Sequence, residues 1–125
     1  MPELAQQQCE VCTRKPLRVA QDEMDELKTQ IPQWMLLEPE GTARLQRTYN
    51  FPDFRSAIAF TNELGAIASA EKHHPTLLTE SGKVTVTWWT QPVSGLHKND
   101  FIMAAKTDRV AAHCLARLLL SSQIR

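Results

Sequence analysis

The spacing of apolar residues along the chain predicts two well-bounded helices in its first two thirds. The first covers residues 21–30, is rich in acids at its start and ends before Pro32. The second begins after Asp53, which can cap it, and ends by about His74, because the residue before Pro75 avoids the α region. The stripe of this second helix consists of Phe54, Ala57, Ile58, Thr61, Leu64 and Ala68.

Strand patterns occupy the segments on either side of the second helix. Residues 34–38 are short and apolar, and residues 42–51 alternate between apolar and polar positions after a turn, which indicates a hairpin. Residues 77–79 predict another short strand. Residues 83–90 give the strongest strand signal of the chain, because they are rich in β-branched and aromatic side chains.

A third helix follows, with Asn99 or Asp100 as its expected cap. The predicted order is α-β-β-α-β-β-α, which favours an α+β fold in which a four-stranded antiparallel sheet carries three helices on one face. Residues 1–20 are read as an N-terminal arm and residues 21–125 as a single domain. The apolar positions of the third helix include Phe101, Ala104, Ala105, Ala112, Leu115 and Leu119.

Composition narrows the function classes without selecting one. The 125 residues include 14 Lys plus Arg and 14 Asp plus Glu, and this neutral balance argues against direct nucleic-acid binding. No apolar run approaches the ~20 residues that span a bilayer, so no membrane association is expected. The first residues lack the pattern of a secretory signal, and a cytoplasmic location is therefore expected.

Three cysteines are too few and too unevenly spaced for a disulfide framework. The pair Cys9 and Cys12 has zinc-ligand spacing, but a structural zinc site needs four ligands and the chain offers one such pair. His113 and Cys114 would complete a site only if the last helix came near. Free thiols are the favoured interpretation, and Cys9 and Cys12 are weak zinc candidates.

The motif that carries chemistry is His73-His74-Pro75, which stands at the end of the second predicted helix. Histidine can give and take protons near neutral pH, and proline restricts the path of the chain after the pair. Taken alone, this spacing fits a surface pair without a role better than an active site. Adjacent helical residues point about 100° apart, which suits a shared metal ion poorly.

The surroundings of the pair resemble the bacterial pterin-4a-carbinolamine dehydratases over roughly residues 20–112. The upstream Ile31-Pro32-Gln33-Trp34 and the helix from Phe54 to Leu64 also fit this family. The stretches that carry the resemblance are Ala70-Glu71-Lys72-His73-His74-Pro75, Gly82-Lys83-Val84-Thr85-Val86-Thr87-Trp88-Trp89-Thr90 and Gly95-Leu96-His97-Lys98-Asn99-Asp100-Phe101-Ile102-Met103-Ala104-Ala105.

The resemblance implies a hydro-lyase that dehydrates 4a-hydroxytetrahydrobiopterin, or a close pterin analogue, to quinonoid dihydropterin. That substrate forms when an aromatic amino-acid hydroxylase, such as the enzyme of phenylalanine hydroxylation, uses its pterin. The expected role is recycling in tetrahydrobiopterin metabolism, without a metal or redox cofactor. The resemblance also implies a homodimer or tetramer, with a hydroxylase as a possible partner.

The reaction needs an acid for the departing 4a-hydroxyl and a base for the N5 proton, and the resemblance assigns both roles to His73 and His74, in either order. Asp100 belongs to the family pattern and is expected either to orient a histidine or to cap the last helix. The expected substrate-binding residues are Lys72, Pro75, Trp89, Thr90, Gln91, Pro92 and Asp100.

Three positions depart from the family pattern. Gln91 stands where a third histidine is usual, and glutamine can form hydrogen bonds but cannot exchange a proton near neutral pH. Ser69 stands where an acid is common, and Ser81 where an aromatic residue is common. The alternative hypothesis is therefore a paralogue of low activity, or an inactive one, that acts as a pterin- or protein-binding module.

Overall fold

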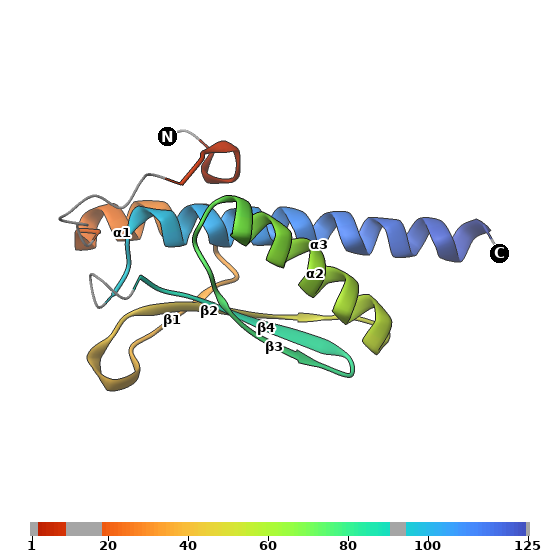
Figure 1. The fold of residues 1–125 in the computed structure, drawn as a ribbon. Coiled ribbons are helices and arrows are strands. Elements are labelled where there is room, and N and C mark those ends of the chain that lie inside the picture. Colours follow the sequence, from red (N-terminus) through yellow and green to blue (C-terminus); the bar gives the residue numbers. More distant parts are fainter. Residues whose placement is uncertain (1–2, 10–18, 91–94, 125) are drawn as a thin grey trace.

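The computed structural model describes residues 3–9, 19–90 and 95–124, and its helices cover one face of an antiparallel sheet (Figure 1). The predicted fold class is confirmed. The helices are α1 (Gln21–Lys28), α2 (Phe54–Ala70) and α3 (Lys98–Ile124). The strands are β1 (Met35–Leu37), β2 (Arg44–Asn50), β3 (Thr76–Glu80) and β4 (Lys83–Trp88), and short 3₁₀ helices η1 and η2 cover Leu4–Gln6 and Pro39–Gly41.

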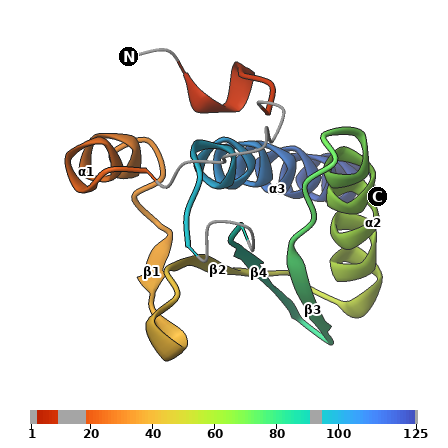
Figure 2. The same ribbon diagram turned by 60° about the vertical axis from the view of Figure 1, so that its left-hand side comes forward.

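The four strands lie in the order β1-β2-β4-β3, and every neighbouring pair is antiparallel (Figure 2). Strand β2 alternates as its sequence predicts, because Leu45 and Tyr49 are buried while Thr48 and Asn50 are exposed. Val84, Val86 and Trp88 of β4 are fully buried. The core therefore lies between this face of the sheet and the helices.

Helix α2 begins as predicted, with Asp53 as its cap. The Asp53 carboxylate accepts hydrogen bonds from the backbone N–H and the hydroxyl of Ser56, and these bonds hold the pKa of the carboxyl below its usual value. The buried face differs from the predicted stripe, since Phe54 is exposed and Phe60 is fully buried. The buried positions of α2 are Ser56, Ala57, Phe60, Leu64 and Ala68.

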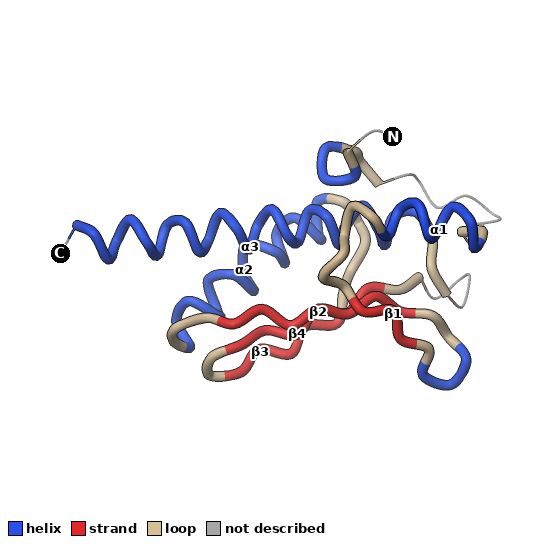
Figure 3. The backbone as a smooth tube through the Cα atoms, turned by 180° about the vertical axis from the view of Figure 1, so that it is seen from behind, coloured by secondary structure: helices blue, strands red, loops and turns tan. Residues whose placement is uncertain are grey.

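Helix α3 crosses the molecule, and its C-terminal end extends past the start of α2 (Figure 3). Most of its first half is buried, whereas Leu115 and Leu119, two of the apolar positions named from the sequence, are exposed. The buried residues of its middle part are instead Val110, Ala111 and Cys114. Among the described helices, none has the length and apolar character needed to cross a membrane.

The short helix η1, within the predicted N-terminal arm, lies on the side of α3 that faces away from the sheet (Figures 1 and 2). Leu4 is fully buried there, and its N–H donates to the Gln30 side chain at 2.9 Å. Lys106 of α3 donates to the carbonyl of Ala5 at 3.1 Å. This segment packs on the domain, and the arm boundary at residue 20 stays a prediction.

Candidate active site

The end of α2 places His73 through its backbone. The N–H of Lys72 donates to the carbonyl of Ser69, and the N–H of His73 donates to the carbonyl of Ala68, at 3.2 and 3.1 Å. Lys72 itself has a φ of 56°, in the left-handed region. These features form a Schellman motif, which ends α2 at Ala70, four residues before the predicted limit. The motif turns His73 toward the start of α3.

The carboxylate of Asp100 is the centre of the site. It is fully buried in the first turn of α3, and its Oδ1 lies 2.6 Å from Nε2 of His73. Its Oδ2 accepts from the Thr90 hydroxyl at 2.8 Å and from the backbone N–H of His97 at 2.9 Å. A buried carboxylate is costly unless it is paired and hydrogen-bonded, and these three groups supply the pairing.

The ring of His73 also has a fixed plane. It stacks on Trp88 with ring centroids 5.5 Å apart and an angle of 6° between the planes. The indole of Trp88 is held in turn, because its Nε1 donates to the hydroxyl of Thr107 at 3.1 Å. His73 therefore has its orientation fixed by Asp100 at one nitrogen and by Trp88 across its face.

These contacts decide which nitrogen of His73 can do chemistry. An ionised Asp100 requires a hydrogen on Nε2, whether the imidazole is neutral or protonated. Nδ1 is then the nitrogen left for a ligand. It is a base in the neutral ring and an acid in the protonated ring, as in other histidines oriented by a buried carboxylate.

The remaining predicted site residues lie farther from this cluster or outside the described residues. His74 and Lys72 are exposed beside His73, and Pro75 is half-buried. Trp89 packs under the guanidinium of Arg44, whose central carbon lies 4.2 Å from the ring centroid. Gln91 and Pro92 fall in the range 91–94, outside the described residues.

Two contacts of the site have no counterpart in the sequence predictions. His97 reaches Asp100 through its backbone N–H, and its spacing of three residues from an acid is that of a capping box with an unusual first residue. The N–H of Cys9 donates to the Glu71 carboxylate at 2.7 Å, two residues before His73. No pattern in the chain predicts this second contact, because it joins residues 62 positions apart.

The zinc hypothesis gains no partner from these contacts. Burial, and then the nearby charge of Glu71, raise the pKa of the Cys9 thiol to about 12. Cys12 lies outside the described residues. In the part of the chain that the structure describes, no three His, Cys, Asp or Glu side chains are grouped so as to hold a metal ion.

Comparison with known proteins decides the family. A family model described as pterin 4 alpha carbinolamine dehydratase matches residues 18–110. The chain belongs to this family. The resemblance inferred from the motifs is confirmed, and so is the enzyme class, since pterin-4-alpha-carbinolamine dehydratases are hydro-lyases.

Relatives of similar length support the same assignment. The chain is 50% identical over 113 residues to a Nitrosococcus oceani protein named as a pterin-4-alpha-carbinolamine dehydratase. The aligned region covers 90% of this chain and 100% of that protein. A Microcystis aeruginosa protein with the same name is 54% identical over 110 residues, covering 88% and 95% of the two chains.

Solved structures give the same fold. The crystal structure of a transcriptional coactivator/pterin dehydratase from Brucella melitensis matches with a TM-score of 0.69 and 27% identity, covering 76% of this chain and 99% of that one. A pterin dehydratase-like protein described as a RuBisCO assembly factor matches with a TM-score of 0.54 and 20% identity, covering 62% and 88%. The second likeness concerns the fold alone.

Proposed function

We propose that this protein dehydrates 4a-hydroxytetrahydrobiopterin to quinonoid dihydropterin by histidine acid–base catalysis. The family supplies the reaction class. The observation that carries the proposal for this chain is the His73–Asp100 pair, in which a buried carboxylate orients an imidazole beside a second, exposed histidine. Imidazole side chains can both donate and accept a proton near neutral pH.

In the proposed reaction, His73 and His74 share two proton transfers. One imidazolium protonates the 4a-hydroxyl, which leaves as water when the C4a–O bond breaks. One neutral imidazole takes the proton from N5, and the electrons of that N–H bond form the new C4a–N5 double bond. The orientation of Nδ1 supports a direct role for His73, and the exposure of His74 leaves its ring free to meet the substrate.

The test is the rate of quinonoid dihydropterin formation by purified protein, measured above the uncatalysed reaction. His73→Ala and His74→Ala should each lower kcat by on the order of 10²-fold or more, because each removes a general acid or base. His113→Ala is the matched control, since His113 is exposed on α3 and belongs to no contact of the site. Unchanged rates in both site variants would refute the proposed mechanism.

A second candidate function is a pterin- or protein-binding module of low activity, and Gln91 is the residue that favours it. Glutamine cannot supply the proton exchange of the usual third histidine. If the site is otherwise competent, Gln91→His should raise the dehydration rate at least several-fold. No gain, together with retained binding of a dihydropterin, would favour the binding module.

The proposal extends to the setting of the enzyme. We propose that the protein recycles the pterin used by an aromatic amino-acid hydroxylase, as in phenylalanine hydroxylation. It would then work in the cytoplasm together with that hydroxylase. A homodimer or tetramer is proposed as the working form. Exposed apolar side chains on the edge strands and on α3 support an assembly of this kind, including Met35, Leu78 and Leu119. Light scattering of the purified protein tests this part.

A further inference from the structure

The start of α3 is capped in an unusual way, by a histidine. His97 immediately precedes the first helical residue, Lys98, and its Nδ1 accepts a hydrogen bond from the backbone N–H of Asn99 at 3.0 Å. In return, Oδ2 of Asp100 accepts the backbone N–H of His97 at 2.9 Å. This reciprocal arrangement is a capping box in which imidazole replaces the usual hydroxyl side chain.

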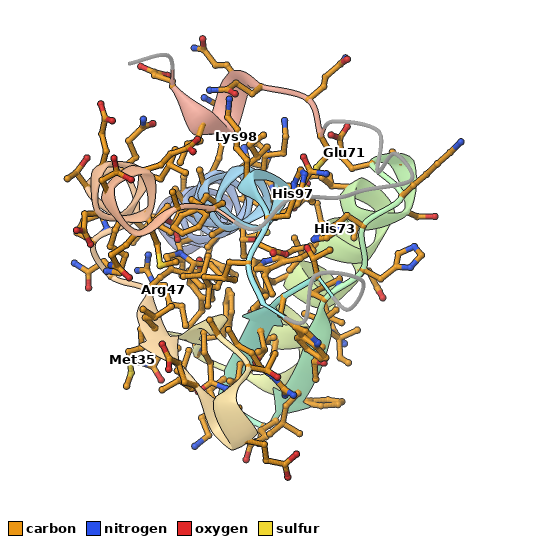
Figure 4. All side chains as sticks on the ribbon, turned by 90° about the vertical axis from the view of Figure 1, so that its left-hand side faces the viewer. Met35, Arg47, Glu71, His73, His97 and Lys98 are labelled. Atoms are coloured by element: carbon orange, nitrogen blue, oxygen red, sulfur yellow. The ribbon has the colours of Figure 1, made fainter. Side chains whose placement is uncertain are left out.

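The same carboxylate serves the cap and the candidate catalytic histidine. Oδ2 of Asp100 accepts the backbone N–H of His97, the capping residue, and Oδ1 binds Nε2 of His73. The cap residue His97 is itself 8% exposed and Asp100 is fully buried, so neither group has room to reorient freely. The carboxylate of Asp100 is therefore a direct path by which a change in the cap can reach His73. Figure 4 shows His97 at the start of α3 and His73 just beyond α2.

We propose that His97 is a positioning residue for His73, that it acts through Asp100, and that it does so only as a neutral imidazole. The catalytic part of this inference rests on the proposed function. The geometric part, the link from the cap to the orientation of His73, does not depend on which reaction the site performs.

Protonation of His97 removes the cap for two physical reasons. A proton on Nδ1 eliminates the lone pair that accepts the N–H of Asn99, so two hydrogen-bond donors then face one another. A positive charge at a helix N-terminus is also unfavourable, because the exposed N–H groups already give that end a partial positive charge. Acidification adds this proton, so the cap is lost toward lower pH.

Charges around His97 act in both directions. The carboxylate of Asp100 favours a proton nearby, but it already accepts hydrogen bonds from three groups. Among the described residues, Asp100 and Lys98 lie close to His97 on α3, and His73 shares the Asp100 carboxylate. Glu71 lies at the end of α2, where its carboxylate accepts the backbone N–H of Cys9.

The experiment compares wild type, His97→Ala and His97→Ser, with His113→Ala as a control on the same helix. Alanine removes the acceptor, whereas serine keeps a cap that does not titrate. At pH 8, His97→Ala should lower Tm by about 3–6 °C and kcat/KM by roughly tenfold, mainly through kcat. His97→Ser should restore most of both losses, and His113→Ala should match wild type.

The pH profile separates positioning from a merely structural role. Between pH 8 and pH 5, wild type should lose more Tm and more kcat than His97→Ser, because only wild type loses its cap by protonation. Identical profiles for these two proteins would overturn the inference. This comparison remains decisive even if His97→Ala does not fold.

A readout without substrate distinguishes this inference from the proposed function. Nitrogen-15 NMR of the His73 ring at pH 8 should show the hydrogen fixed on Nε2 in wild type and His97→Ser, and a mixture of tautomers in His97→Ala. An unchanged His73 spectrum in folded His97→Ala would overturn the positioning role, whatever the enzyme assay gives. A changed spectrum in a protein without dehydratase activity would uphold positioning and refute only the proposed function.

Discussion

Asp100 is the residue on which the contacts of the site converge. The sequence left two roles open for it, orienting a histidine or capping the last helix. In the structure Asp100 is the third residue of α3, where it contacts His73 and accepts the backbone N–H of His97, which precedes the helix. The motif His73-His74-Pro75 identified the region of the candidate site, because histidine is the residue type typical of proton transfer near neutral pH. The contact between Trp88 and His73 could not be predicted from the sequence, because this stacking depends on where α2 ends.

The neighbour of Cys9 in the folded protein could not be predicted from the spacing of the cysteines. Its spacing from Cys12 suggested metal chemistry, whereas its actual neighbour is Glu71 on a distant part of the chain. Burial and that carboxylate keep Cys9 protonated, so its chemistry is that of an inert thiol.

We expect iodoacetamide to modify native Cys9 at pH 7.5 at least tenfold more slowly than the same residue in urea-unfolded protein. Its pKa of about 12, raised from 9.0, leaves very little thiolate. Peptide mapping by mass spectrometry separates Cys9 from Cys12, and Cys114, with a pKa raised to about 11 by burial and by Glu63, should also react slowly. Equal rates for native and unfolded Cys9 would contradict this environment.

At the scale of elements, the periodicity placed the helices and strands but not their ends. The predicted end of α2 relied on Pro75, which excludes helix only at the preceding residue. The chain leaves the helix earlier because Lys72 adopts a left-handed conformation, for which neither lysine nor its neighbours give a signal. The start of α3 was missed for a similar reason, since histidine is not a usual cap.

Lys72→Gly should raise the free energy of unfolding by about 0.5–1 kcal/mol, because glycine adopts a φ of 56° without the steric cost of a Cβ. Lys72→Ala is the control, since it removes the same side chain but keeps the Cβ. Urea unfolding measures both. A glycine variant no more stable than the alanine variant would show that the left-handed turn is not strained.

Across the whole molecule, one carboxylate joins the long helix to the sheet. Oδ1 of Asp108 on α3 accepts from Trp34 Nε1 at 2.9 Å, from Arg47 at 2.7 Å and from the hydroxyl of Tyr49. Burial, and then the charge of Asp108, raise the pKa of Tyr49, so it remains a donor. Such long-range convergence is set by packing and has no local pattern in the sequence.

Asp108→Ala should lower the free energy of unfolding by about 2–4 kcal/mol, because it leaves three donors without their common acceptor. Asp108→Asn should cost less, since an amide oxygen can still accept. Asp25→Ala, at an exposed position of α1, should change stability little. If denaturant unfolding gives Asp108→Ala the same free energy of unfolding as Asp25→Ala, the three hydrogen bonds to Asp108 do not stabilise the fold.

The dehydration rate of the double variant His73→Ala/His74→Ala, measured beside His113→Ala, tests whether these two histidines carry the reaction. If the two adjacent histidines perform the proton transfers, the double variant should form quinonoid dihydropterin only at the uncatalysed rate while still binding a dihydropterin. The control should keep the wild-type rate. A folded double variant that retains most of the wild-type rate would contradict the assignment of the proton transfers to His73 and His74.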